Sequence, residues 1–333
     1  MCRSRGLFLA LLAGLALAGC GAAADGQVTV ARAPKLARWT PFVHVQRPLD
    51  LAGPRSDGSL VLAAAGRLWL LQQSGHISRF APGYQSPGGE EPYIATPHPG
   101  HLGYGFGSGA VYVIRLSKPR GILRIGANGK VRRFASINAP GLIDGITFDE
   151  TGTFGFRLLV TVNHGLTTTA LAIDSHGKVS TITTSAPRVE GGIVVAPGNF
   201  GRFAGDLIAP DETGGRVFAI TPSGRSVLVA NSGLPHGGDI GVESEAFVPP
   251  TTQNAFLADR LTPGNRHPGD DVVLRIGRAT LVAAGVRPGD LLVATEGGAL
   301  TDAIRCGSKS CSVHHVASGP AIAHAEGHIA FVR

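Results

Sequence analysis

Asp144-Gly145-Ile146-Thr147-Phe148 opens a unit that recurs about every 50 residues along the chain. After this opening strand come a second and a third strand rich in β-branched residues, a turn containing Gly, and a fourth strand. Glu190-Gly191-Gly192-Ile193-Val194 opens the next copy in the same way. The later strands of the two copies are expected at 157–162, 169–174 and 178–183, and at 205–209, 216–221 and 225–230.

Four further copies lie before and after these two. Their strands are expected at 59–64, 67–72 and 76–81; at 110–115, 121–125 and 130–135; at 245–247, 255–259 and 271–276; and at 290–295, 299–305 and 312–317. The 48 Gly residues mark the turns, and no amphipathic helix is apparent. Four strands per repeat of roughly 40 to 50 residues is typical of a propeller blade. The sequence therefore predicts an all-β, six-bladed β-propeller with four-stranded blades.

The C-terminal stretch predicts how the ring closes. Ala325-Glu326-Gly327-His328-Ile329-Ala330-Phe331 has the form of an opening strand, but no blade follows it. The sixth copy, in turn, has no opening strand before Asp290. We expect this strand to become the inner strand of either the last blade or the first, which removes exposed sheet edges.

In these repeats the chain resembles the six-bladed propellers of the NHL-repeat and gluconolactonase/regucalcin kind, whose blades also open with Asp-Gly, Glu-Gly or Asn-Gly. The resemblance covers most of residues 40–333. In the lactonases it implies a metal held by a Glu and an Asp that open two blades and by two Asn residues. Asp144 and either Glu190 or Glu326 match the acids. Asn163, Asn199 and Asn231 do not match the Asn positions, which leaves lactone hydrolysis open.

The first twenty residues predict export and a lipid anchor. Arg3 and Arg5 precede an apolar run, 6–19, that is too short to span a bilayer. The run ends at Leu17-Ala18-Gly19-Cys20, which resembles a bacterial lipobox; ordinary cleavage leaving a free thiol is the alternative. We predict a signal peptide at 1–19, a lipidated tether at 20–38 and the propeller at 39–333. The protein is then extracytoplasmic and held at the membrane through Cys20.

Cysteine use and charge agree with that compartment. Cys306 and Cys311 flank a short Gly/Ser loop and are expected to form a disulfide, because a zinc site usually needs four ligands.

The formal charge of +7 comes from basic residues scattered singly, which argues against a nucleic-acid partner. The chain has no Gly-x-Ser-x-Gly motif of a serine hydrolase. We expect a monomer whose partner is a small molecule or a protein.

The opening strands place acids around the channel. Equivalent positions in successive blades converge at one mouth, so we predict a ligand-binding ring there. Clustered carboxylates raise one another's pKa unless a cation compensates, and Ca²⁺ suits oxygen ligands. Asp144, Glu190 and Glu326 are the candidate Ca²⁺ ligands; a purely structural role for the acids is the alternative. The ring comprises Glu91, Asp144, Glu190, either Glu243 or Glu245, and Glu326, with Glu245 taken for its blade.

Histidines supply the candidate bases. His324, Glu326 and His328 alternate along the last strand and are expected to share one face. His328, and His164 after the second strand of its blade, are the candidate catalytic residues because His titrates near neutrality. Two functions follow. The first is non-enzymatic binding of a ligand, metal or protein at the channel. The second is a Ca²⁺-dependent enzyme, either a lactonase-like hydrolase or an oxidoreductase resembling the quinoprotein sugar dehydrogenases.

Overall fold

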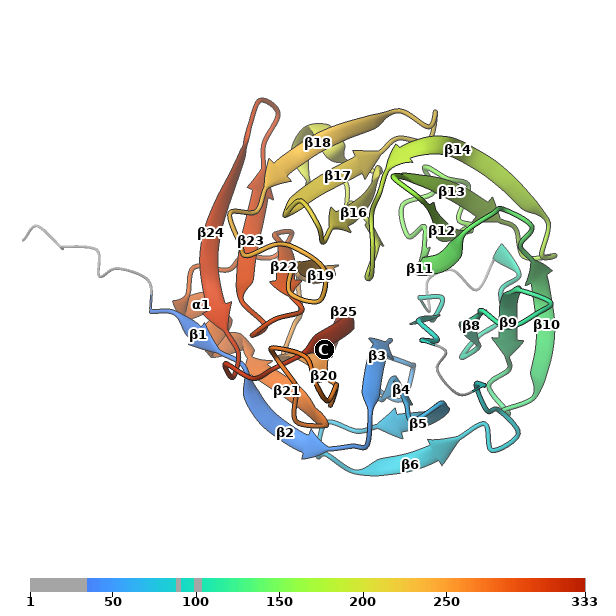
Figure 1. Ribbon diagram of the computed structural model, residues 1–333, viewed down its shortest axis with the longest axis horizontal. Coiled ribbons are helices and arrows are strands. Elements are labelled where there is room, and N and C mark those ends of the chain that lie inside the picture. Colours follow the sequence, from blue (N-terminus) through green and yellow to red (C-terminus); the bar gives the residue numbers. More distant parts are fainter. Residues whose placement is uncertain (1–34, 88–90, 99–103, 333) are drawn as a thin grey trace, which may run out of the picture. The chain divides into compact units, whose positions relative to one another are not determined.

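Six antiparallel sheets surround a central channel in the computed structural model, which describes residues 35–87, 91–98 and 104–332 (Figure 1). The predicted signal peptide, Cys20 and most of the predicted tether lie outside the described residues. The described part contains one short α-helix, α1 (Arg278–Ala283), which the sequence reading missed. No helix in this part is long and apolar enough to cross a membrane. The predicted six-bladed β-propeller is confirmed.

The first four blades follow the order of the chain, each running from the channel outward. The sequence reading located most of their strands but missed the first inner strand. Blade one is β3 (Pro48–Ala52), β4 (Leu60–Ala64), β5 (Arg67–Leu71) and β6 (Ile77–Phe80); blade two is β7 (Ile94–Ala95), β8 (Val111–Arg115), β9 (Gly121–Ile125) and β10 (Val131–Ser136); blade three is β11 (Leu142–Phe148), β12 (Leu158–His164), β13 (Thr167–Ile173) and β14 (Val179–Pro187); blade four is β15 (Val194–Val195), β16 (Leu207–Asp211), β17 (Arg216–Ile220) and β18 (Ser226–Asn231).

The last two blades exchange strands, which corrects the predicted fifth and sixth repeats. The predicted strands exist, but main-chain pairing does not follow the order of the chain. The second and third strands of the fifth repeat belong to blade six, and all three strands of the sixth repeat join the opening strand of the fifth repeat in blade five. Blade five is β19 (Val242–Phe247), β22 (Leu291–Thr295), β23 (Thr301–Cys306) and β24 (Cys311–Ser318), with β1 (Ala37–Arg38) added in parallel; blade six is β25 (Ala325–Val332), β20 (Asn254–Asp259), β21 (Val272–Gly277) and β2 (Thr40–His44).

Both ends of the described chain complete blade six. β25 pairs with β20 beside the channel, with Ala255 opposite Phe331, and β2 pairs with β21 on the outside, with Thr40 opposite Arg275. The prediction that the C-terminal strand closes the ring is confirmed, but the strand joins β20 and β21 of the predicted fifth repeat and not the strands of the predicted last or first repeat. Because three distant segments make this sheet, blade six forms only when both termini are in place.

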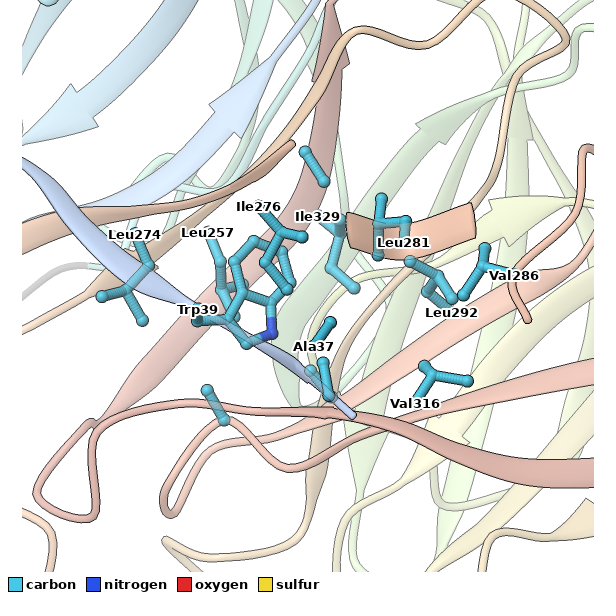
Figure 2. Packing of buried hydrophobic residues seen from close by; sticks show 14 of the residues in the cluster. Ala37, Trp39, Leu257, Leu274, Ile276, Leu281, Val286, Leu292, Val316 and Ile329 are labelled. Carbon is cyan, nitrogen blue, oxygen red and sulfur yellow. The ribbon is translucent and has the colours of Figure 1, made fainter. Parts of the chain in front are cut away.

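Trp39, from the N-terminal segment, is the largest side chain of the apolar cluster between blades five and six. Trp39 is 2% exposed and packs with Leu257, Leu274 and Ile276 of blade six, while Leu281 of α1 joins from the crossover (Figure 2). The Trp39 indole Nε1 donates a hydrogen bond of 2.8 Å to Thr301 Oγ1 in blade five. A buried Trp whose N–H is satisfied contributes apolar burial without an unpaired donor, so Trp39 holds the two exchanged blades together.

The predicted disulfide between Cys306 and Cys311 is confirmed. The two residues face each other at the end of the hairpin formed by β23 and β24. The bond therefore crosslinks the turn of blade five.

β-Bulges in the inner strands determine where two of the acidic side chains lie. The pairing of β11 with β12 skips Asp144, and the pairing of β19 with β22 skips Glu243, so each acid is the extra residue of a β-bulge. Gly191, which follows the opening acid of blade four, has φ of 72°, and a Cβ there would overlap the Glu243 carbonyl and carboxylate of the next blade. The acid–Gly step thus lets the backbone of one blade approach the acid of the next.

We expect Gly191→Ala to destabilise the propeller more than Gly233→Ala. Gly233 has φ of 75° but open space around its Cβ position, so both variants carry a similar backbone cost, about 1–2 kcal/mol. Gly191→Ala adds the overlap with Glu243, and overpacking costs about 1–3 kcal/mol more. Thermal unfolding of both proteins measures the difference. Equal losses of stability would show that the contact between blades four and five has room to relax.

Candidate functional site

The inner strands β3, β7, β11, β15, β19 and β25 line the channel, one from each blade (Figure 1). Residues at or just before their first positions contact one another across blades, as Tyr93, Glu243 and Glu326 do. Residues at their other ends line one shared cavity. The six strands therefore run in the same direction, and the channel has two chemically different ends.

Seven carboxylates gather at the end where the inner strands begin, which we call the acidic mouth. Five precede or open inner strands, and two follow directly after second strands. The cations that counter them among the described residues are Arg188, Arg260 and His324. The seven acids of the acidic mouth are Glu91, Asp144, Glu190, Glu212, Glu243, Glu296 and Glu326.

Tyr93 joins the acids of blades five and six. Its hydroxyl lies 2.5 Å from Glu243 Oε1 and 3.2 Å from Glu326 Oε2. Arg260 Nη1 lies 3.4 Å from Glu326 Oε1 and also contacts the half-exposed Glu91. Burial, followed by repulsion from Glu326, raises the pKa of Glu243, and burial together with Glu243 raises the pKa of Tyr93. The phenol therefore stays protonated and donates its hydrogen bond to a carboxylate.

Asp144 has an amide partner, Asn163, which the sequence alone did not match to the Asn positions of the lactonases. Asn163 Nδ2 donates a hydrogen bond of 2.5 Å to Asp144 Oδ2, and Asn163 Oδ1 accepts one of 2.6 Å from Thr168. Burial, and then the negative charge of Glu190, raises the pKa of Asp144. Asn163 is the residue before the last of β12, the second strand of its blade. Glu212, Glu296 and Arg260 directly follow the second strands of their blades. The recurrence of polar residues at the end of the second strand was the sequence signal that could have identified all four residues.

His324 lies between two carboxylates. Its Nε2 is 2.8 Å from Glu296 Oε1 and 3.4 Å from Glu326 Oε1, and the three residues can bring ligating atoms within 4.8 Å of one another. Burial alone would lower the pKa of His324, but the hydrogen bonds that its imidazole donates to Glu296 and Glu326 raise it to about 10. The imidazole is therefore protonated near neutral pH. Its Nδ1 is buried and has no hydrogen-bond partner within the described ranges.

Glu212 adds a group that titrates close to neutral pH. Burial, and then repulsion from Glu296 and Glu190, raises its pKa to about 8. Its Oε1 atom is buried and finds no partner among the residues that the structure describes. The sequence reading missed Glu212 and Glu296 because it considered only the opening strands.

The structure separates the predicted site residues into groups. Glu91, Asp144, Glu190 and Glu326 reach the acidic mouth, and Glu190 forms an ion pair of 2.6 Å with Arg188. Asp144, Glu190 and Glu326 were the predicted metal ligands. In the described part of the chain, the three residues whose ligand atoms lie close enough to share a metal ion are Glu296, His324 and Glu326, so only Glu326 is common to both sets.

His164 does not join the carboxylate cluster. It ends β12 with an exposed side chain, beside the turn to β13, although Asn163 next to it is buried against Asp144. Glu245 is also absent from the acidic mouth. It lies further along β19, and Glu243 provides the acid of blade five.

His328 does not share a group with His324 and Glu326, contrary to the predicted alternation. The register of β25 against β20 shifts after Glu326, and Gly327 has φ of 68°. His328 Nδ1 instead lies 3.0 Å from Oδ1 of the fully buried Asp50 in blade one. Burial works to lower the pKa of His328, but the charge of Asp50 and its hydrogen bond, together with the backbone of Ile193 and Ile146, raise that pKa.

The channel is obstructed where His328 lies. A Cβ on Gly192 of blade four would lie 3.0 Å from the Gly327 carbonyl of blade six and 3.4 Å from His328 Cδ2, and blades four and six are not neighbours in the ring. The backbone of Ile193 and Ile146 also helps to raise the pKa of His328, so blades three and four adjoin this level. We call this level, formed by Asp50, Gly192, Gly327 and His328, the waist.

A cavity of about 540 Å³ lies beyond the waist, where the inner strands end. Glu245 lines it, is 0% exposed, and has no hydrogen-bond partner for either carboxylate oxygen within the described residues. Burial raises the pKa of Glu245 well above its usual value. The two ends of the channel are thus an acidic mouth and a mainly apolar cavity with one buried carboxyl group.

No protein-family model matches this chain, and no curated protein matches it. Solved structures with a similar fold include virginiamycin B lyase from Staphylococcus aureus, with 13% identity over 84% of this chain and 88% of that one and a TM-score of 0.45. A gluconolactonase from Xanthomonas campestris has 13% identity over 70% and 86%, with a TM-score of 0.38. A Bacteroides thetaiotaomicron protein of unknown function has 12% identity over 87% and 65%, with a TM-score of 0.47. Similarities at this level say nothing about what this chain binds or catalyses.

We expect Glu245→Gln to change how stability depends on pH. Because the native state raises the pKa of Glu245 above 4.5, it holds the proton more tightly than the unfolded state does. Wild-type stability therefore falls as pH rises from about 4.5 through the raised pKa, whereas the neutral Gln variant lacks this contribution. The melting temperature of the variant minus that of wild type should grow with pH. Parallel melting curves across about pH 4 to 9 would contradict the assignment.

Proposed function

We propose that the acidic mouth binds a divalent cation and that the chain uses this site to bind a ligand rich in oxygen atoms. The observation that carries the proposal is the excess of carboxylates at the acidic mouth over the three cations that face them. Buried like charges destabilise one another unless protons or a cation compensate. A divalent ion would compensate the excess without protonating the acids.

Glu296, Glu326 and His324 are the residues that would hold the ion. His324 Nε2 already lies within 3.4 Å of an oxygen of each Glu, so a metal would take the place of the proton between them. An imidazole nitrogen with carboxylate oxygens suits Zn²⁺ or Mn²⁺, whereas Ca²⁺ takes oxygen ligands only. For Ca²⁺, Glu243 would have to replace His324, and it is close because it shares Tyr93 with Glu326.

The bound ion would act as a Lewis acid toward an oxygen of the ligand. The chain's own residues would orient that ligand. Arg260 and Arg188 are cations at the mouth, and Asn163 and Tyr93 hold Asp144 and Glu243 in place by hydrogen bonds. This combination favours a ligand with hydroxyl or carboxylate groups.

Isothermal titration calorimetry with Ca²⁺, Mn²⁺ and Zn²⁺ tests the proposal. We expect one ion to bind per chain, with an affinity at least tenfold weaker in Glu296→Gln. At an ion concentration of about 100 times Kd, the wild type should gain about 2.7 kcal/mol of stability. Glu150→Gln is the matched control, because Glu150 is exposed and lines the cavity at the opposite end. Absence of binding, or equal binding by Glu296→Gln and wild type, would rule out this site.

A metal-dependent hydrolase of the lactonase-like kind is the second candidate. Glu212 favours it, because a buried carboxyl group beside Glu296 with a pKa of about 8 can exchange a proton near neutral pH. Turnover of lactones by the metal-loaded protein, lost in Glu212→Gln, would identify the site as catalytic. Metal binding without turnover supports the binding function. No residue in the described part specifically favours the quinoprotein-like dehydrogenase.

We also propose that the propeller works outside the cytoplasm as a monomer tethered through lipidated Cys20, without a nucleic-acid partner. The lipobox-like sequence before Cys20 supports the anchor. Propeller pairing starts at Ala37, which leaves a short tether after Cys20.

Cys20→Ser should move the full-length protein from the membrane fraction to the soluble fraction when it is expressed in a bacterium that processes lipoproteins. Labelling with a clickable fatty acid should mark wild type and fail on Cys20→Ser. Cys2→Ser, which changes a residue of the predicted signal peptide, is the control and should keep both properties. An unlabelled wild type would overturn the anchor.

A further inference from the structure

We propose that the cavity beyond the waist is a second binding site, for a small molecule with an apolar body and one protonated amine. This site is distinct from the proposed metal site, because the two occupy opposite ends of the channel and the contacts among Gly192, Gly327 and His328 lie between them.

Each blade contributes to the floor of the cavity one residue of its inner strand or, in blade four, the residue directly before it. The floor residue of a blade is the cavity-lining residue that lies nearest the waist. Four of the six floor residues are aliphatic. The floor residues are Leu51, Ile94, Ile146, Ile193, Glu245 and His328. Small-molecule sites are typically apolar cavities of about 300–1,000 Å³ with a few polar groups that fix orientation, and this cavity has about 540 Å³.

Glu245 is the polar group that lacks a partner. Its side chain is 0% exposed, and neither carboxylate oxygen accepts a hydrogen bond within the described ranges. Leaving a buried polar group unpaired costs about 1–3 kcal/mol, and more for a charged group. A ligand that places a charged N–H donor against Glu245 would remove this cost, whereas a purely apolar ligand would keep it.

His328, the other polar residue of the floor, does not provide that partner. Its Nδ1 lies 3.0 Å and 3.2 Å from the two oxygens of Asp50, so the charge of this imidazole is already balanced by a buried carboxylate. The Asp50 pair also limits the repulsion that an imidazolium would exert on an ammonium ligand. An ammonium group therefore complements Glu245, because it can take the place of the proton that this buried carboxyl group holds and pair with the carboxylate that remains.

Three eight-carbon probes with different head groups test the inference on the full folded chain. In isothermal titration calorimetry, n-octylamine should bind the wild type at least tenfold more tightly than n-octanol, and n-octanoate should not bind measurably. Glu245→Gln should lose at least tenfold in affinity for octylamine while its affinity for octanol stays within twofold. Asp270→Asn, which changes an exposed carboxyl group outside the lining of this cavity, should bind octylamine like wild type.

Several outcomes would overturn the inference. Failure of octylamine to bind the wild type is one, octanol binding as tightly as octylamine is another, and equal binding of octylamine by Glu245→Gln is a third. The head-group comparison on wild type needs no variant, so it decides the question even if Glu245→Gln does not fold. Glu296→Gln should bind octylamine normally, which keeps a failure of the proposed metal site separate from a failure of this one.

Discussion

The main-chain pairing of β25 with β20 is the interaction on which the rest of the molecule depends. It supplies blade six with its inner strand and so closes the ring, while β2 completes the same sheet on the outside. The same strand, with His324 directly before it, brings His324 and Glu326 to the acidic mouth and His328 to the waist. Closure of the fold and assembly of both ends of the channel are therefore one event, because one strand carries the residues for all three.

The two ends differ because six inner strands run in the same direction around one axis. Residues near the start of each strand meet their counterparts at one end, where acids have accumulated, and residues near the end of each strand meet at the other, where aliphatic side chains prevail. The waist keeps the two environments apart. Buried carboxyl groups are tolerated at the mouth because they are hydrogen-bonded to Tyr93, Asn163 and His324, whereas Glu245 beyond the waist has no such partner in the described part.

The exchange of strands between blades five and six has a structural cost and a structural gain. The chain must leave blade five after β19, build two strands of blade six, and return through α1. In return, the apolar cluster around Trp39 draws on both blades and on both ends of the propeller. Opening the ring at this point would expose that cluster to water, which opposes separation of the two blades.

By itself, the sequence determined the propeller, its blade number, the disulfide between Cys306 and Cys311, and the gathering of Glu91, Asp144, Glu190 and Glu326 at one mouth. These follow from local signals, since strand periodicity, turn residues and equivalent repeat positions are all written within one repeat. The signal peptide and the lipid anchor at Cys20 lie in residues 1–34, outside the described part, and stay predictions.

Only the tertiary structure decided which strands share a blade, that Glu243 rather than Glu245 joins the acids, and that Asn163, Glu212 and Glu296 complete them. It also decided that His328 binds Asp50 instead of joining His324. The physical reason is that β-bulges and pairing between distant strands set these positions, and a bulge of one residue redirects every side chain that follows it.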